Sequence, residues 1–301
     1  IGITSLSTSL KELDVSLNDS INNSIQLNDT NSIFNVIDQG VLLSHNAPLT
    51  KVSFSPNGNN IFTCSIDGYV KIWSIKSDLK DFFDTKKIKN LQDSIILDDT
   101  IQVNSSVLSA CWDDRGKEPL LYIGNINGQV IIYNITHKTI VNTIELLANS
   151  SHKTIKEEST LRFVKCISNN PGDMTFAVSI VSKGYDNIKG INGILSIYNL
   201  NNGNLIHNFH IKNHHINSMI YNHNGNMLIT GSYDGKIRVF DMITYDIIME
   251  WYAHTSQITY ITLSNDENTV WSISTSDYIK QWSLHRCQLL RNYKIPTIFN
   301  D

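Results

Sequence analysis

Two stretches of the chain decide its fold: His223–Met242 reads HNGNMLITGSYDGKIRVFDM, and Asn265–Leu284 reads NDENTVWSISTSDYIKQWSL. They align without gaps at a spacing of 42 residues. A third stretch, Asn57–Ile75, has the same layout of a turn, a short strand, a tight turn and an alternating strand that ends in an aromatic residue. Repetition at this period indicates that one small unit of strands recurs along the chain.

Five such units can be aligned on the aromatic residue that ends the alternating strand. These residues are Trp73, Tyr133, Tyr198, Phe240 and Trp282. The residues one and three positions before them are almost all apolar, as in Val70 and Ile72 before Trp73. Alternation with a period of two predicts a strand that is buried between neighbours.

A turn signal precedes the alternating strand in four of the five units. The pairs are Asp67-Gly68, Asn127-Gly128, Asn192-Gly193 and Asp234-Gly235, whereas the fifth unit has Ser276-Asp277. Asp-Gly and Asn-Gly pairs favour the type I′ turn, whose positive φ angles suit the twist of a hairpin. We therefore expect a tight hairpin of this type in four units.

A four-stranded unit with an aromatic residue at a fixed place and a period of about 40–45 residues resembles the WD repeat, the blade of a β-propeller. The resemblance runs from about Phe34 to the end. It predicts an all-β WD-repeat β-propeller with about five four-stranded blades present, as part of a seven-bladed ring. Residues 1–32 are expected to be a polar linker that is partly helical, and residues 33–301 an incomplete propeller.

In WD repeats a loop His, a strand Ser or Thr, a turn Asp and a strand Trp form a hydrogen-bonded network. The resemblance implies a full network in the first unit and partial ones in the fifth and fourth units. The residues are His45, Ser65, Asp67 and Trp73, then His254, Ser274 and Trp282, then Ser232 and Asp234. The fourth unit has Phe240 for Trp and Lys212 at the His position. A structural role is expected, because a buried indole N–H and imidazole need partners.

The residue before each turn Asp or Asn marks a candidate partner-binding patch. These residues are Ile66, Ile126, Ile191, Tyr233 and Thr275. Four of the five are apolar or aromatic, and clustered exposed apolar groups tend to mark interfaces. The alternative is that they pack under neighbouring loops.

Composition and motifs argue against other classes of protein. The net charge is −4, which disfavours nucleic acid as a partner. The four cysteines have no metal-ligand spacing, and no motif of an enzyme occurs, so we expect no catalytic residue, metal or cofactor. Phosphoinositide-binding propellers carry paired arginines, which are absent here. Ubiquitin-ligase substrate receptors carry a short motif like Trp112–Arg115, but here it follows a first strand instead of a third.

Three segments narrow the resemblance to one group of WD-repeat proteins. Asn222–Met242, followed by WYAH (Trp251–His254) and NDENTVWSIS (Asn265–Ser274), closely resembles the family of WD repeat-containing protein 91. The resemblance implies an endosomal scaffold that is cytoplasmic and peripheral to the membrane. Its implied partners are a late-endosomal Rab GTPase, a partner WD-repeat protein and the class III phosphatidylinositol 3-kinase complex, whose activity the family restrains. It also implies further propeller sequence after the point that matches Asp301.

Overall fold

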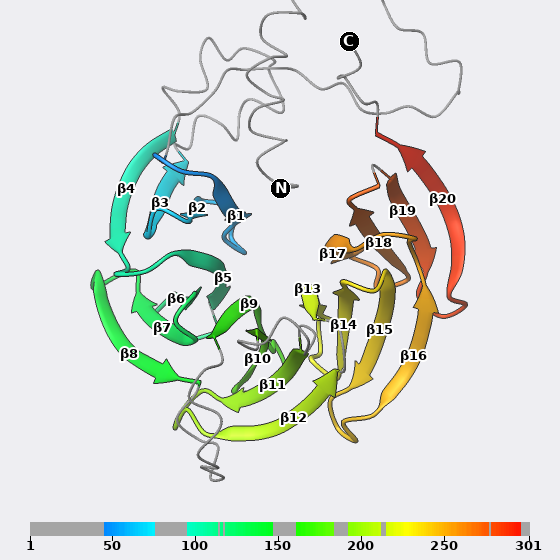
Figure 1. Cartoon of the computed structure of the whole chain (residues 1–301). Coiled ribbons are helices and arrows are strands. Elements are labelled where there is room, and N and C mark those ends of the chain that lie inside the picture. The colour runs from blue at the N-terminus through cyan, green and yellow to red at the C-terminus, as the bar shows by residue number, and fades with distance from the viewer. Residues whose placement is uncertain are drawn as a thin grey trace, which may run out of the picture. The chain divides into compact units, whose positions relative to one another are not determined.

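A computed structural model describes residues 45–75, 95–113, 115–116, 118–146, 161–183, 192–211, 215–276 and 278–295. Over these residues the chain forms five four-stranded antiparallel sheets and no helix, and the predicted WD-type β-propeller blades are confirmed (Figure 1). The predicted linker, residues 1–32, and residues 33–44 of the predicted propeller lie outside the described residues.

The chain divides into two compact units, Ile1–Gln102 and Val103–Asp301. Unit 1 contains blade 1, which consists of β1 (Leu49–Phe54), β2 (Asn60–Ser65), β3 (Tyr69–Ile75) and β4 (Ile95–Gln102). In every blade the four strands pair in chain order, so each blade is a simple antiparallel meander.

Unit 2 contains blades 2 to 5. Blade 2 comprises β5 (Val107–Asp113), β6 (Leu120–Asn125), β7 (Gln129–Asn134) and β8 (Thr139–Glu145), and blade 3 comprises β9 (Leu161–Asn169), β10 (Thr175–Lys183), β11 (Asn192–Asn199) and β12 (Leu205–Ile211). Blade 4 comprises β13 (Ile216–Tyr221), β14 (Met227–Ser232), β15 (Lys236–Asp241) and β16 (Ile247–Tyr252), and blade 5 comprises β17 (Ile258–Leu263), β18 (Thr269–Ser274), β19 (Tyr278–Ser283) and β20 (Gln288–Lys294). The first strands β5, β9, β13 and β17 follow one another side by side (Figure 1).

The aromatic residues that aligned the repeats all lie in the third strand of a blade. Trp73, Tyr133, Tyr198, Phe240 and Trp282 are at most 6% exposed. In unit 2, Tyr198, Phe240 and Trp282 contribute to apolar clusters that join consecutive blades. Trp282 of blade 5, for example, packs with Ile229 and Trp251 of blade 4. Burial of such large rings between sheets supplies much of the stabilisation of a β domain.

Small residues in the second strand let the next blade approach closely. A Cβ atom added to Gly124 of β6 would lie 2.4 Å from Cγ1 of Val164 in β9. A Cβ atom added to Gly231 of β14 would likewise lie 2.6 Å from Cγ2 of Ile258 in β17. Both junctions are therefore sockets that hold one branched side chain of the following blade, because real Cβ atoms do not approach carbon so closely.

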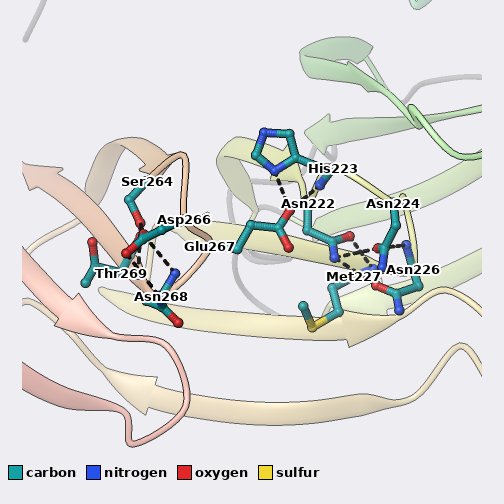
Figure 2. A network of polar contacts seen from close by, with 10 residues as sticks. All are labelled: Asn222, His223, Asn224, Asn226, Met227, Ser264, Asp266, Glu267, Asn268 and Thr269. Carbon is teal, nitrogen blue, oxygen red and sulfur yellow. Dashed lines mark hydrogen bonds and ion pairs between the residues drawn. The ribbon is translucent and has the colours of Figure 1, made fainter.

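The loops between the first and second strands connect consecutive blades of unit 2 through polar contacts. Arg115 of blade 2 donates to the carbonyl of Asn170 in blade 3, whose Nδ2 donates to the carbonyl of Gly225 in blade 4 at 3.1 Å. Figure 2 shows the next connection, where His223 of blade 4 pairs with Glu267 of blade 5 through Nδ1 and Oε1 at 2.6 Å. These bonds link all four blades at one end of their sheets.

The tight turns differ from the predicted type I′ geometry. In blade 1 the N–H of Gly68 donates to the carbonyl of Ser65, and within the Asp67-Gly68 pair only Gly68 has a positive φ, +84°. A type I′ turn needs positive φ at both central residues, so this is a three-residue loop closed by glycine. The physical reason is that the Asp67 carboxylate accepts the N–H of Tyr69 at 3.0 Å, which favours an ordinary turn conformation at Asp67.

The predicted turn of the third unit was wrong. Asn192 and Gly193 lie within β11, where they pair with Ser182 and Val181 of β10. The β10–β11 hairpin is longer than the other hairpins, and the inserted residues 184–191 that join the strands lie outside the described residues. The Asn-Gly pair does not form the turn here, because the two strands are longer and include it.

Candidate functional site

Blade 1 contains a continuous chain of hydrogen bonds. Nδ1 of His45 lies 2.9 Å from Oδ2 of Asp67, and Nε2 of His45 lies 2.9 Å from Oγ1 of Thr63. The indole Nε1–H of Trp73 donates to the same Thr63 oxygen at 3.0 Å. The network therefore runs Asp67–His45–Thr63–Trp73 and uses both nitrogens of the imidazole.

Thr63 occupies the place that the sequence analysis gave to Ser65. The Ser65 hydroxyl instead donates to the carbonyls of Ala47 and Pro48, and it accepts the N–H of Asp67. The register explains the error. Trp73 stands opposite Ile61, so its diagonal neighbour on that face is Thr63, while Ser65 lies two residues farther along β2.

We expect Thr63→Val to destabilise unit 1 by about 2 kcal/mol, because it leaves the buried indole N–H and imidazole nitrogen without a partner. Thr63→Ser is the matched control, since it keeps the hydroxyl that the imidazole and the indole share. Denaturant unfolding followed by tryptophan fluorescence would compare the two variants. Equal losses for Thr63→Val and Thr63→Ser would contradict the assignment.

Blade 5 has the same arrangement with one member missing. Nε2 of His254 lies 2.8 Å from Oγ of Ser272, and Nε1 of Trp282 donates to that oxygen at 3.0 Å. Ser272 thus takes the place predicted for Ser274, whose hydroxyl pairs with Ser276 at 2.7 Å. Nδ1 of His254 is buried and has no hydrogen-bond partner.

The environment of His254 disfavours its charged form. Burial lowers the pKa of His254 to about 4, and the nearby positive charge of Lys280 contributes in the same direction. Asp67 in blade 1 behaves differently. Its partial burial favours the neutral form, but hydrogen bonds from Tyr69 and His45 outweigh this and hold its pKa below the ordinary value. Blade 5 therefore keeps a neutral imidazole at neutral pH.

Because His254 has a pKa of about 4 in the folded state and about 6.5 when unfolded, we expect a pH-dependent contribution to stability. The contribution is present above about pH 6.5 and is lost as the pH falls toward 4, below which stability no longer depends on this group. The total is about 3 kcal/mol. Urea unfolding at several pH values would measure it. His254→Gln should flatten the profile in this window, and an unchanged slope in the variant would contradict the prediction.

Blade 4 replaces the histidine network with an arginine network. Arg238 lies in β15, and its Nη1 and Nη2 donate to Asp234 at 3.2 and 2.5 Å. Nη1 also donates to Ser232 at 3.0 Å, and Nε donates to Glu250 of β16 at 2.6 Å. Both predicted residues, Ser232 and Asp234, are thus held by a cation that the sequence analysis did not single out. Lys212 lies outside the described residues.

The candidate partner-binding residues begin the tight turns between second and third strands. Ile126 and Tyr233 in unit 2 are 46% and 49% exposed, Thr275 is exposed as well, and Ile66 in unit 1 is 43% exposed. The Tyr233 ring lies 5.1 Å from the ring of His215, which supports it from one side. Ile191 and Asp277 lie outside the described residues.

In the segment Trp112–Arg115, which resembles the motif of ubiquitin-ligase substrate receptors, Arg115 makes contacts within the fold. Arg115 donates to both Asp113 oxygens, at 2.7 and 2.8 Å, and to backbone carbonyls of blade 3. Burial of Asp113 favours its neutral form, but Arg115 outweighs this and keeps its pKa below the ordinary value. Arg115 therefore joins blades 2 and 3 instead of facing a partner.

A model of the WD domain, G-beta repeat, matches residues 38–74 and 203–241, which include His45, Asp67 and Trp73 of blade 1 and Asp234 of blade 4. The chain is 29% identical to the WD repeat-containing protein 91 homolog of Dictyostelium discoideum over 271 residues, which is 89% of this chain and 31% of that protein. The chain therefore contains segments similar to the WD repeat in blades 1 and 4. It is also 25% identical to WD repeat-containing protein 91 of Gallus gallus over 271 residues, 88% of this chain and 34% of that protein.

A shorter match to WD repeat-containing protein 91 of Danio rerio reaches 47% identity over 72 residues, 24% of this chain and 10% of that protein. The WD-repeat chain spans about a third of the length of the curated relatives that it matches over most of its own length. Through these repeats and relatives the chain is similar to WD repeat-containing protein 91 over most of its own length.

Two absences were found within the described segments. No group of three or more His, Cys, Asp or Glu side chains there is arranged to hold a metal ion. No helix in that part of the chain has the length and apolar character needed to cross a membrane.

Proposed function

We propose that this WD-repeat chain acts without catalysis as a scaffold at endosomal membranes, where it binds a late-endosomal Rab GTPase and a partner WD-repeat protein. Through them it restrains phosphatidylinositol 3-kinase activity during the conversion of early to late endosomes. The proposal draws on the resemblance to WD repeat-containing protein 91 over most of the chain. It places the protein in the cytoplasm, at the endosomal membrane through its partners.

The observation that supports protein binding is a set of exposed side chains on tight turns at one end of the unit 2 sheets. Ile126 and Tyr233 are about half exposed although turn positions usually carry polar residues. The turn that carries Tyr233 is held in place, because Arg238 binds the next residue, Asp234. An anchored aromatic loses little conformational entropy on binding, and such residues often dominate protein interfaces.

The histidine and aspartate side chains at this end of the blades bind other groups of the fold. His45 and Asp67 bind each other, and His254 binds Ser272. The side chains of His45 and Thr63 are buried, and the Thr63 oxygen already accepts the indole N–H of Trp73, so a substrate has no access to either group. This supports a scaffold over an enzyme.

A pull-down with a late-endosomal Rab GTPase, loaded with either a GTP analogue or GDP, tests the proposal. Tyr233→Asp and Ile126→Asp should each weaken capture of the GTP form by tenfold or more, because a charge would be buried against an apolar partner. Ile243→Asp is the matched control. Ile243 is 78% exposed in the loop between β15 and β16, at the opposite end of the same blade as Tyr233.

Normal capture by correctly folded Tyr233→Asp and Ile126→Asp variants would rule out this surface. A second arm uses vesicles with and without phosphatidylinositol 3-phosphate and no added protein. Binding that depends on the lipid alone would favour the alternative of a phosphoinositide-binding propeller.

A further inference from the structure

The turn between the second and third strands carries a carboxylate in blade 1. Asp67 contacts Nδ1 of His45 at 2.9 Å and accepts the backbone N–H groups of Asn46 at 3.2 Å and Tyr69 at 3.0 Å. Three nitrogens of the blade thus surround one anionic group, which is the pattern of a built anion site.

In blade 4 a cation on the third strand pairs with the carboxylate at the corresponding turn position. Arg238 stands two positions before the strand's aromatic residue, Phe240, and pairs with Asp234, the counterpart of Asp67. A long basic side chain at that strand position is therefore placed to neutralise an anion in the turn.

Blade 5 has both of these partners, and among its described residues no anion lies between them. Its histidine, His254, has a buried Nδ1 with no partner, whereas the same atom of His45 binds Asp67. Its third-strand cation, Lys280, stands two positions before Trp282 and contacts neutral groups, the carbonyl of Ala253 at 2.7 Å and the indole ring of Trp282. The residue in the place of Asp67 and Asp234 is Ser276.

We propose that Ser276 is a phosphorylation site and that its phosphate takes the place of the missing carboxylate, binding Nδ1 of His254 and the ammonium group of Lys280. An ATP-dependent serine/threonine kinase would transfer the γ-phosphoryl group. A bond forms between Oγ of Ser276 and phosphorus, the bond to ADP breaks, and the hydroxyl proton passes to the kinase's base.

Position and charge both favour this reaction. Ser276 is half-buried in a turn, next to the exposed Thr275, and its hydroxyl is held only by Ser274 at 2.7 Å among the contacts found for the described residues. A phosphate brings a charge of about −1.5 to −2 and strong acceptor oxygens. Charge-assisted bonds to an imidazolium and an ammonium group are among the stronger polar contacts in proteins.

The modification would change blade 5 in two ways. It would satisfy a buried polar atom, which stabilises the fold around His254. It would also place a negative charge beside Thr275, one of the candidate partner-binding residues. The inference about His254 stands on the geometry of three blades and does not rest on the proposed function.

The test installs phosphoserine at position 276 of the full chain by genetic code expansion. The titration of the His254 ring is followed by ¹⁵N NMR, and thermal unfolding is measured in parallel. Phosphoserine at position 275 is the matched control, because it adds the same charge one residue away on an exposed side chain. We expect the His254 pKa to rise from about 4 toward the ordinary value of about 6.5, and the melting temperature to increase, only for position 276.

A second variant separates the specific contact from a general charge effect. In the His254→Gln background, phosphoserine at 276 should no longer raise the melting temperature as it does in the parent. An identical His254 titration for phosphoserine at 275 and 276, or a lower melting temperature for 276, would overturn the proposal. So would mass spectrometry of the protein isolated from its own cells if it covered the Ser276 peptide fully and found no phosphate there.

Discussion

Replacing Gly235 by alanine should lower the free energy of unfolding of unit 2 by about 3 kcal/mol or more. Gly235 has a φ of +76°, a conformation that costs an L-residue about 1–2 kcal/mol. A Cβ atom there would lie 2.2 Å from the carbonyl oxygen of His254. That carbonyl cannot move away easily, because the N–H groups of Ala253 and His254 both donate to the Gly235 carbonyl. Overpacking against fixed backbone adds roughly another 1–3 kcal/mol.

Gly203 provides a control in the same unit that separates the backbone conformation from the clash. It has a φ of +68°, but the nearest atoms to its added Cβ belong to the Ile144 side chain, at 3.5 Å or more. Gly203→Ala should therefore cost only the conformational part, about 1–2 kcal/mol. Urea denaturation of both variants would measure the difference. Equal losses would show that the His254 loop yields to the new methyl group.

Replacing Arg238 by methionine should destabilise unit 2 by about 3 kcal/mol. The Arg238 side chain is 7% exposed and binds Asp234, Ser232 and Glu250 together. Methionine keeps the stem of the side chain but leaves the Asp234 carboxylate, itself largely shielded from water, without its cation. Removing one member of a shielded ion pair costs more than the pair contributes, because the remaining charge stays desolvated.

Lys236→Met is the comparison for Arg238→Met. Lys236 also pairs with Glu250, but this carboxylate is 36% exposed and keeps Arg238 as a partner, so loss of the Lys236 pair should cost little stability. Thermal and chemical unfolding should thus show a large loss for Arg238→Met and almost none for Lys236→Met. If Asp234→Asn, added to Arg238→Met, failed to recover any stability, the cost could not be assigned to the unpaired carboxylate.

The fold was largely readable from the sequence because its main determinants repeat. The five aromatic residues are buried in third strands, and the alternating apolar residues before them lie in the same strands. Each aromatic is large and buried, so its position is under strong physical constraint. Turn geometry was less readable. The same Asp-Gly pair suits two kinds of hairpin loop, and the bond from Tyr69 to Asp67 selects between them.

The candidate site was only partly readable. Thr63 and Ser65 share one face of β2, since residues two apart on a strand point the same way, and period alone cannot distinguish them. The pairing register distinguishes them, and counting ten residues back from Trp73 and Trp282 to Thr63 and Ser272 would have done so. The role of Arg238 was not predicted, because the fourth unit lacks the His and Trp of the usual network. A single arginine can nevertheless donate hydrogen bonds to several acceptors at once.

The sockets at Gly124 and Gly231 bear on how such a chain can change over evolutionary time. Each junction pairs a small residue of one blade with a branched residue of the next, Val164 or Ile258. Both junctions use the same pair of shapes, a glycine and a β-branched side chain, so at these sites a duplicated or reordered blade would meet a neighbour of matching size. A larger residue in place of either glycine would need a smaller residue opposite it, so change at these junctions should proceed by paired substitutions.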